Sequence, residues 1–330
     1  MTCDDVDVLL AVRDGARSPD LDQHLQDCAE CRALADSIVP RAVQGYELGP
    51  VIAWGGMGQV RLARDLRLGR QVALKELMFE SDTLAARLVR EARVAAELEH
   101  PNIVPIYDVG TWPDGMPFYT MRYVEGRTLF AALAAASSLA ERMQLLPAAI
   151  AACNAVAFAH SHGIAHRDLT PANILLGDHG ETYVIDWGLA KDLRTHPVHA
   201  QPLLTAQGEV LGSPAYMPRE QAVGDPIDER ADVYALGAIL YHLVAGAPPY
   251  SGRTSSELLE QVRSAPPPSL VGPRALVAVI AKAMAREAAD RYPTARELAA
   301  ALHGLQLRAF APRTQRKWLA VAAAALLPWL

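Results

Sequence analysis

Hydrophobic and polar positions follow one pattern in the first part of the chain and another in the second. Between residues 46 and 121 the apolar runs, such as 59–62 and 71–74, have the length of β-strands. A single longer stretch there, 82–99, has the length of a helix. This part of the chain is therefore predicted to form a sheet with one helix.

The apolar stretches after residue 128 are longer and rich in alanine and leucine, which predicts helices over segments such as 148–160 and 231–245. The proline triplet 266–268 predicts a surface turn between two of these helices. Strands followed by helices predict an α+β fold of two lobes, a small β-rich lobe and a larger helical lobe.

Composition limits the classes of function. The chain has 330 residues, 51% of them hydrophobic, which suffices for one large domain or two smaller ones. Its formal charge of −6 argues against a general nucleic-acid binder, because such a protein needs a basic face. Four cysteines are too few for a disulfide framework and indicate a reduced, cytosolic chain. The acidic start of the chain is unlike a secretory signal peptide.

The two ends differ from the main part of the chain. Residues 1–40 predict a small helical segment, and residues 41–45 predict a linker. Near the other end a basic stretch, 309–317, precedes an uninterrupted apolar run, 318–330. As a helix this run spans about 20 Å, so it is interpreted as the first part of a transmembrane helix with its basic flank in the cytoplasm. The alternative is an apolar helix packed on the protein or on a partner.

The strongest chemical signal is the run His-Arg-Asp-Leu-Thr-Pro-Ala-Asn at 166–173, followed by Asp-Trp-Gly at 186–188. Asp168 can hold a hydroxyl group, and Asn173 and Asp186 offer oxygen ligands suited to Mg²⁺. Phosphoryl transfer needs this combination, because it depends on positioning and on neutralising phosphate charge.

These two runs resemble the catalytic and magnesium-binding loops of protein kinases, and residues 46–308 resemble a bacterial serine/threonine kinase throughout. The resemblance implies the bilobal kinase fold, with an N-lobe at 46–123 and a C-lobe at 124–308. It implies that ATP binds with Mg²⁺, or with Mn²⁺ in its place, that Asp168 accepts the substrate hydroxyl proton, and that Glu91 pairs with Lys75 to hold the phosphates.

The nucleotide site follows from the same resemblance. The residues implied in it are Ala53, Gly55, Gly56, Gly58, Val60, Ala73, Lys75, Glu91, Met121, Tyr123, Asn173 and Asp186. Three positions depart from the family pattern: Ala53 replaces the first glycine of the loop, Trp187 replaces phenylalanine, and Thr170 replaces a lysine that contacts the transferred phosphate. Loss of that fixed cation predicts slower turnover.

An activation segment is expected between residues 186 and 220. Its Gly-Ser-Pro-Ala-Tyr-Met sequence at 212–217 resembles bacterial serine/threonine kinases and favours protein Ser or Thr hydroxyls as substrates. Arg167 is expected to pair with a phosphate added to this segment. The candidate acceptors are Thr195, Thr205 and Ser213, with turn-capping hydroxyls as the alternative reading.

Two structural supports are also implied by the resemblance. Glu220 is expected to pair with Arg291, and Asp232 is expected to tie the catalytic loop to the central helix.

A metal site is predicted near the start of the chain. His24, Cys28 and Cys31 share one face of a continuous helix, and Cys3 can complete a set of four ligands suited to Zn²⁺. The pattern resembles the small zinc-binding domain of bacterial anti-sigma factors. The alternative places the cysteines as small apolar helix residues and exposes the histidine.

The sequence as a whole predicts a serine/threonine protein kinase that transfers the γ-phosphate of ATP to proteins in bacterial signalling and autophosphorylates, with dimers serving phosphorylation in trans. The expected location is the cell membrane, with a single span and a cytoplasmic kinase, or the cytoplasm if the apolar run is not an anchor. The main alternative is a pseudokinase scaffold whose zinc segment binds a partner such as a sigma factor; Ala53 and Thr170 favour it, and the intact lysine and metal ligands oppose it. A small-molecule phosphotransferase of the same fold is opposed by the long activation segment.

Overall fold

The computed structural model describes Cys28 and residues 42–43, 45–55, 58–79, 81–192, 198–199, 214–252 and 254–310. These residues form two compact units, one up to Glu99 with Val104–Val124 and the other of His100–Ile103 with the chain from Glu125. The following predicted features lie outside the described residues: Cys3, His24 and Cys31, Gly56, the three candidate phosphate acceptors, and the apolar run 318–330.

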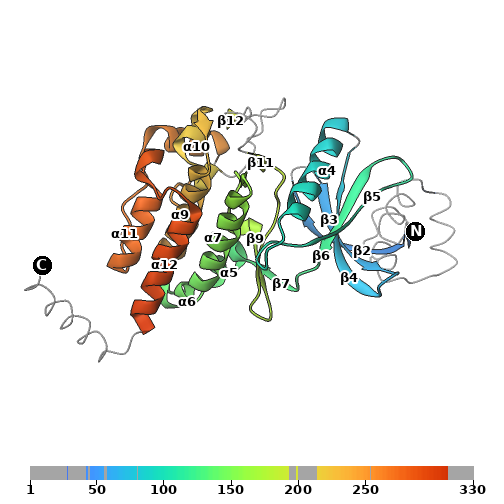
Figure 1. Cartoon of the computed structure of the whole chain (residues 1–330), viewed down its shortest axis with the longest axis horizontal. Coiled ribbons are helices and arrows are strands. Elements are labelled where there is room, and N and C mark those ends of the chain that lie inside the picture. Colours follow the sequence, from blue (N-terminus) through green and yellow to red (C-terminus); the bar gives the residue numbers. More distant parts are fainter. Residues whose placement is uncertain are drawn as a thin grey trace, which may run out of the picture. The chain divides into compact units, whose positions relative to one another are not determined.

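The first unit is an antiparallel sheet with one helix packed on it (Figure 1). The strands run in the order β1-β2-β3-β4-β6-β5, and they are β1 (Ala42–Val43), β2 (Tyr46–Trp54), β3 (Gly58–Asp65), β4 (Arg70–Leu77), β5 (Ile106–Thr111) and β6 (Pro117–Arg122). Helix α4 (Asp82–Glu97) packs mainly on β5 and β6 and is capped at its N-terminus by Ser81, whose side chain accepts a hydrogen bond from the Leu84 N–H. The strands and the helix predicted for this region are confirmed.

Alternation along the strands gives the sheet two different faces. Val72 and Leu74 on β4 point to one face, where they form a buried cluster with Tyr46 and Phe118. Successive side chains on β4 leave opposite faces, so Ala73 and Lys75 point to the other face, the one that reaches α4. The sheet therefore keeps its charged lysine away from the apolar cluster.

The second unit is mainly helical. Its helices are α5 (Leu129–Ala135), α6 (Leu139–Met143), α7 (Leu146–Ser161), α8 (Arg219–Val223), α9 (Arg230–Ala245), α10 (Ser255–Ser264), α11 (Arg274–Ala283) and α12 (Ala295–Phe310). Short strands pair as β7 (Gly126–Thr128) with β9 (Ile174–Gly177) and β10 (Thr182–Val184), β8 (Ile164–Ala165) with β11 (Lys191–Asp192), and β12 (Val198–His199) with β13 (Pro226–Ile227). The proline triplet lies between α10 and α11 without regular structure, as predicted.

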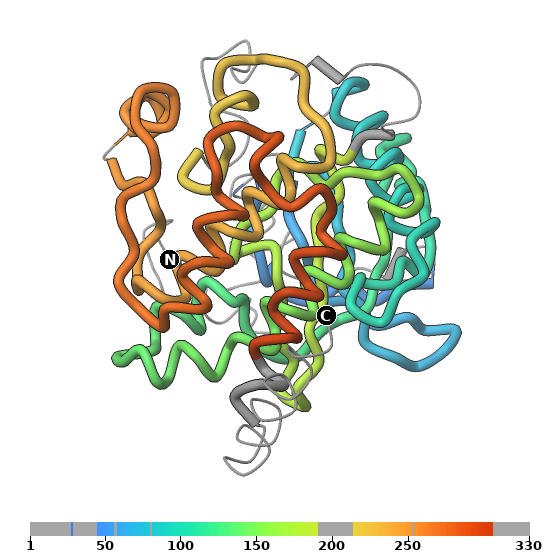
Figure 2. Tube along the Cα trace, turned by 60° about the vertical axis from the view of Figure 1, so that its left-hand side comes forward, coloured from blue at the N-terminus to red at the C-terminus, as the bar shows by residue number. Residues whose placement is uncertain are grey.

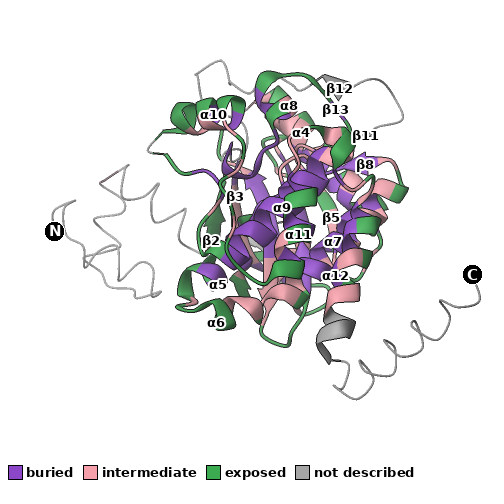
Figure 3. Cartoon of the chain, turned by 90° about the vertical axis from the view of Figure 1, so that its left-hand side faces the viewer, coloured by how far each residue is buried: buried purple, intermediate pink, exposed green. Residues whose placement is uncertain are grey.

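Helix α9 is the centre of this unit. It is buried along almost its whole length, as the purple ribbon in Figure 3 shows, and it packs against α7, α11 and α12 (Figure 2). A helix that is apolar on all sides is a core helix in a folded domain of this size. Its one carboxylate in the first turn, Asp232, is therefore placed deep inside the unit.

Among the described residues, the stretch Leu139–Ser161 is long and apolar enough to cross a membrane by composition alone. Its larger part is α7, seven residues of which are buried against the rest of the unit, including Cys153 and Val156. Contacts with α9 and α12 account for this burial, so α7 is a core helix of the domain.

Candidate active site

Lys75 is held on the sheet by a carboxylate from α4. Its Nζ lies 2.6 Å from Oε1 of Glu91, and only 11% of the lysine side chain and 1% of the glutamate side chain are exposed. The Tyr119 hydroxyl donates a hydrogen bond to the same carboxylate oxygen at 2.7 Å. Such additional hydrogen bonds offset the cost of burying two charges. The ion pair implied by the sequence is present.

Local packing explains why these groups meet. Lys75 lies directly opposite Tyr119 in the β4–β6 register, so both side chains leave the same face of the sheet. Leu88 and Ala92 on α4 pack against the Tyr119 ring, and Glu91 lies between them on the same helix. The position of the carboxylate is thus set by a small apolar contact between helix and sheet.

The other nucleotide candidates of this unit gather on that face. Val60 lies opposite Lys75 in the β3–β4 register, and Ala73 lies opposite Met121 in the β4–β6 register. Met121 also packs against the Tyr119 cluster, and Tyr123 follows β6 and is half-buried. One face of the sheet therefore carries an apolar surface and a single ammonium group, which suits an adenine ring and a phosphate.

The glycine-rich loop closes the β2–β3 hairpin. The Gly55 N–H donates to the Gly58 carbonyl at 2.8 Å, and the Gly58 N–H donates to the Gly55 carbonyl at 3.3 Å. A Cβ at Gly58 would lie 2.1 Å from the carbonyl oxygen of Glu76, so only glycine fits there. Ala53, by contrast, is exposed on β2, and its methyl group is sterically tolerated.

In the second unit, the loop at 166–173 is anchored by Asp232. The carboxylate accepts hydrogen bonds from the backbone N–H groups of His166, at 2.7 Å, and Arg167, at 2.8 Å, and from His160 Nε2 at 2.9 Å. Burial alone would raise the pKa of Asp232, but the hydrogen bonds and charges of these neighbours lower it below its ordinary value. The carboxylate stays ionised, and the predicted tie between loop and helix is confirmed.

The loop is also fixed from within. The His166 ring accepts a hydrogen bond at Nδ1 from the Asp168 N–H, at 3.3 Å, and donates from Nε2 to the Ile185 carbonyl, at 3.1 Å. The Asn173 side-chain amide donates to the Asp168 carbonyl at 2.8 Å, and the Ile185 N–H donates to the Asn173 carbonyl at 3.0 Å. These bonds place the residue before Asp186 against Asn173.

Two backbone positions in this region are strained. Arg167 has a φ of 71° and Asp186 a φ of 66°, a left-handed conformation that residues other than glycine rarely adopt. Each such position costs about 1–3 kcal/mol and persists only where surrounding contacts enforce it. Here the Arg167 N–H is bound by Asp232 and its carbonyl accepts from Gln221 Nε2 at 2.9 Å, so the strain lies beside Asp168, within an enforced loop.

Asn173 and Asp186 fit a magnesium ion. Because Asn173 Nδ2 is engaged with the Asp168 carbonyl, the Oδ1 atom is the end of that side chain available to a cation. Amide and carboxylate oxygens are the ligands Mg²⁺ prefers, and it commonly takes the remainder from phosphates and water. Within the described part of the chain, no three His, Cys, Asp or Glu side chains gather as a metal site, so a site of these two residues is consistent with such shared coordination.

Thr170 has a structural role that the sequence did not reveal. Its hydroxyl accepts a hydrogen bond from the Ala172 N–H at 3.2 Å and caps the short turn Pro171–Asn173. The side chain is buried, with 6% of the residue exposed. Thr170 therefore holds the turn that presents Asn173, in the place where the family has a lysine.

Trp187 is buried, with 1% exposed, and its ring lies 4.7 Å from that of His166. The large apolar ring thus occupies an interior site, as expected for a residue that replaces phenylalanine. Its Nε1 atom has no hydrogen-bond partner among the described residues. A buried donor without a partner costs about 1–3 kcal/mol, which a phenylalanine would not.

The second predicted support is also present. Arg291 makes a bidentate pair with Glu220, at 2.6 and 2.9 Å, and donates three further hydrogen bonds to the carbonyls of Ala285, Arg230 and Arg286. The arginine side chain is fully buried. This pair fixes the start of α8, whose next residue, Gln221, holds the Arg167 carbonyl.

The sequence matches the protein kinase domain over residues 46–299. The chain belongs to the protein kinase family. The β-rich unit is the N-lobe of this fold, and the helical unit is its C-lobe. The matched residues include the Lys75–Glu91 pair, the catalytic loop at 166–173 and the Asp-Trp-Gly run at 186–188.

Named relatives give the class within the protein kinases. The serine/threonine-protein kinase PknB of Mycolicibacterium smegmatis is 40% identical over 269 residues, 78% of this chain and 42% of that protein. The DNA damage-responsive serine/threonine-protein kinase RqkA of Deinococcus radiodurans is 40% identical over 259 residues, 75% of this chain and 37% of that protein. The chain thus spans less than half the length of these curated relatives. It is a kinase domain of the bacterial serine/threonine class.

A solved structure agrees. A variant of the PknI kinase domain of Mycobacterium tuberculosis is 30% identical, with a TM-score of 0.60 over 80% of this chain and 97% of that chain.

Three residues that support the site were not predicted from the sequence: Tyr119, which binds Glu91, His160, which binds Asp232, and Gln221, which binds Arg167. The role of Tyr119 could have been predicted, because it lies two residues before Met121 on the same strand. No feature of the sequence indicates the roles of His160 and Gln221.

Proposed function

We propose that this kinase domain transfers the γ-phosphate of ATP to Ser or Thr hydroxyls of proteins. The observation that carries the proposal is the buried Lys75–Glu91 pair on the nucleotide face of the N-lobe sheet. A buried ion pair is costly, and replacing it by apolar residues is often neutral for stability. Its presence on the face that suits a nucleotide therefore favours a role in binding phosphate.

The C-lobe supplies the remaining groups. Asp168 accepts the proton of the substrate hydroxyl, and its loop is held by Asp232, so the carboxylate is positioned before substrate arrives. Asn173 and Asp186 would hold magnesium, which neutralises phosphate charge when bound. Lys75 holds the α- and β-phosphates with its ammonium group.

Transfer from γ-labelled ATP with Mg²⁺ tests the proposal. The wild-type chain should label itself and a generic basic protein, and acid hydrolysis should return phosphoserine and phosphothreonine. Asp168→Asn should lose about a hundredfold or more of this rate, because a positioned general base contributes 10²–10⁴-fold. Asp178→Asn, at an exposed turn of the same lobe, is the matched control and should retain activity. Equal labelling by wild type and Asp168→Asn would exclude the proposed role.

A pseudokinase scaffold is the less favoured function. Of the two departures that support it, Ala53 is exposed where its methyl is tolerated, and Thr170 caps a turn within an intact loop. Retention of nucleotide binding without any transfer in the assay above would restore it.

For residues 1–40 we propose a zinc-binding module formed by Cys3, His24, Cys28 and Cys31 that binds a regulatory partner, such as a sigma factor. Thiolates and imidazole are the ligands zinc prefers, and a segment this short needs a metal or another staple to fold. Purification without chelators should give about one zinc per chain by elemental analysis, lost in Cys28→Ser and retained in His179→Ala, at an exposed turn. Metal-free wild-type protein would exclude the site.

We also propose that residues 318–330 begin a membrane anchor that leaves the kinase in the cytoplasm, and that two anchored copies phosphorylate each other. The basic stretch before the run has the charge expected on the cytoplasmic side. Cell fractionation should find the full-length protein in the membrane fraction, and a version with Leu326→Arg and Leu327→Arg in the soluble fraction. Equal fractionation of both would contradict the anchor.

A further inference from the structure

Gln221 of α8 is a buried polar residue that the mechanism above does not use, and its side-chain amide reaches the catalytic loop. The residue is 7% exposed, and it lines the same small cavity as Asp168. Its Nε2 atom donates a hydrogen bond to the Arg167 carbonyl at 2.9 Å. That carbonyl belongs to the peptide unit directly before Asp168, so the hydrogen bond acts on the backbone from which the catalytic side chain extends.

The two peptide units that flank the Cα atom of Asp168 are both held by hydrogen bonds. In the preceding unit, Gln221 binds the carbonyl, and the Asp168 N–H donates to His166 Nδ1 at 3.3 Å. In the following unit, the Asp168 carbonyl accepts from Asn173 Nδ2 at 2.8 Å. Because peptide units are planar, their orientations fix the direction of the Cα–Cβ bond between them. Gln221 contributes to this orientation from outside the loop.

The backbone conformation that Gln221 supports is an unfavourable one. Arg167 has a φ of 71°, in the left-handed region that residues other than glycine rarely adopt. Asp232 binds its N–H and Gln221 binds its carbonyl, so the residue is held from both sides. Such strain persists only where surrounding contacts enforce it. Without the amide of Gln221, the peptide unit can rotate toward a less strained conformation and turn Asp168 with it.

Helix α8 is itself placed by α10. A helix of five residues is too short to be stable alone, so its position depends on its neighbours. Besides the ion pair at its start described above, the Ala222 carbonyl accepts a hydrogen bond from Arg263 Nε of α10 at 2.9 Å. Ala222 also belongs to an apolar cluster with Leu259 and Val262 of α10. The position of α10 therefore sets the position of Gln221.

We propose that Gln221 is a positioning residue for Asp168, and that α10 acts on phosphoryl transfer through α8 and this amide. This role rests on the proposed function, in which Asp168 accepts the proton of the substrate hydroxyl. Gln221 acts through the backbone of Asp168 and takes no part in binding ATP. Its loss should therefore lower kcat and leave the KM for ATP unchanged.

Steady-state transfer from γ-labelled ATP with Mg²⁺ tests this split. Gln221→Met keeps the length of the side chain and removes the donor, and kcat should fall about tenfold, because small displacements of a catalytic group have large effects on rate. Gln261→Met is the matched control, since Gln261 Nε2 donates to the Ser251 carbonyl at 2.8 Å in an exposed part of the same lobe. It should keep the wild-type kcat.

Two kinetic outcomes would overturn the proposal. One is an unchanged kcat in Gln221→Met, or equal losses in Gln221→Met and Gln261→Met. The other is a rise in the KM for ATP that matches the fall in kcat, because that would indicate general loosening of the domain.

Arg263→Met tests the contribution of α10. Arg263 is exposed, and the apolar contact between α8 and α10 remains in this variant, so folding should be retained. The variant should lower kcat about threefold, the effect of one exposed hydrogen bond. If Arg263 acts through Gln221, adding this change to Gln221→Met should cause no further loss. Additive losses would overturn the link between α10 and Gln221.

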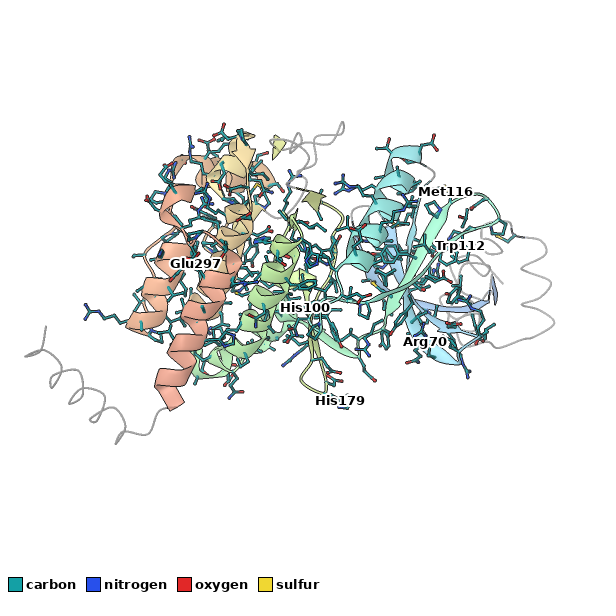
Figure 4. The ribbon with its side chains drawn as sticks, viewed as in Figure 1. Arg70, His100, Trp112, Met116, His179 and Glu297 are labelled. Atoms are coloured by element: carbon teal, nitrogen blue, oxygen red, sulfur yellow. The ribbon has the colours of Figure 1, made fainter. Side chains whose placement is uncertain are left out.

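Hydrogen–deuterium exchange without nucleotide tests the positioning independently of transfer. In Gln221→Met, the amides of residues 166–170 should exchange about tenfold faster than in the wild type. The β9–β10 turn, where Figure 4 labels His179, lies at the end of the lobe away from α10 and should exchange at the wild-type rate. Unchanged exchange over 166–170 would overturn the inference. Faster exchange there, in a chain whose wild type transfers no phosphate, would support the positioning role and contradict the proposed function instead.

Discussion

The two lobes hold their functional charges in different ways. In the C-lobe, Asp232 and Arg291 are buried and saturated, the first by three hydrogen bonds to its carboxylate and the second by five from its guanidinium. In the N-lobe, Lys75 pairs with Glu91, which lies on a helix that rests on the sheet through apolar side chains. The catalytic loop is thus anchored by several buried hydrogen bonds, whereas a carboxylate that pairs with Lys75 is placed by apolar contacts of one helix.

This contrast suggests that the two lobes differ in how easily their functional groups can move. Because the catalytic loop is held by several buried hydrogen bonds, any other conformation would leave ionised or polar groups in the interior without partners. The loop therefore has a single stable conformation. A helix packed through Leu88 and Ala92 can shift at lower cost, so α4 is the element on which regulation can act. The variants below test this contrast, from the largest expected effect to the smallest.

Arg291→Met should destabilise the C-lobe most, by about 3–5 kcal/mol, because it leaves Glu220 without its buried partner and frees three carbonyls. Urea unfolding measures the loss. Arg230→Met is the control, since Arg230 pairs with Asp228 where both side chains are substantially exposed, and it should cost at most about 1 kcal/mol. Similar losses in both variants would show that burial does not distinguish the two pairs.

Asp232→Asn should cost about 2 kcal/mol, because an amide cannot accept all three hydrogen bonds and faces at least one N–H with its own. The loop at 166–173 should become more mobile, and the rate of phosphoryl transfer should fall as a result.

The same variant has a signature in pH. The pKa of Asp232 is lowered by folding, so its contribution to stability is present above the ordinary value of 3.8 and is lost as the pH falls through the folded-state pKa. Wild-type stability should therefore drop on acidification through this window, and Asp232→Asn should show a weaker drop. Asp178→Asn, at an exposed turn, should keep the wild-type profile. An identical acid limb in Asp232→Asn would contradict the assignment.

Tyr119→Phe should have a smaller effect, about 1 kcal/mol, because it removes a single hydrogen bond to Glu91 and keeps the ring that packs on α4. The KM for ATP should rise a few-fold, reporting a less constrained lysine. Tyr107→Phe on the neighbouring strand, whose ring contacts Arg70, is the matched control and should leave KM unchanged. A rise in both variants would point to general weakening of the sheet.

Thr170 gives the smallest expected change in stability. Thr170→Ser should keep the turn cap, and Thr170→Lys should lose about 0.5–1 kcal/mol with it. If the missing cation slows the reaction, Thr170→Lys should nevertheless raise the single-turnover rate, by up to about tenfold. A rate unchanged or lowered relative to Thr170→Ser would reject the electrostatic explanation.

The fold was predictable because local pattern and family resemblance agree in this chain. Strands at 59–62 and 71–74 and helices over 148–160 and 231–245 all lie within elements of the structure. The Lys75–Glu91 and Glu220–Arg291 pairs were predicted because the resemblance to protein kinases implies them, and both are present.

The remaining contacts depend on tertiary packing. His160 reaches Asp232 only because α7 packs on α9, and no periodicity in either helix records that contact. The cap formed by Thr170 was not predicted, although Thr before Pro is a common way to begin a turn.

The close packing at Gly58 determines where the β2–β3 hairpin can accept substitutions. The carbonyl of Glu76 occupies the space that a methyl group would need, so any residue with a Cβ at this position would clash with it. Five residues earlier, Ala53 points into open surroundings and has room to vary. Substitutions in this hairpin should therefore be tolerated at Ala53, before the turn, and should disrupt the hairpin at Gly58, after the turn.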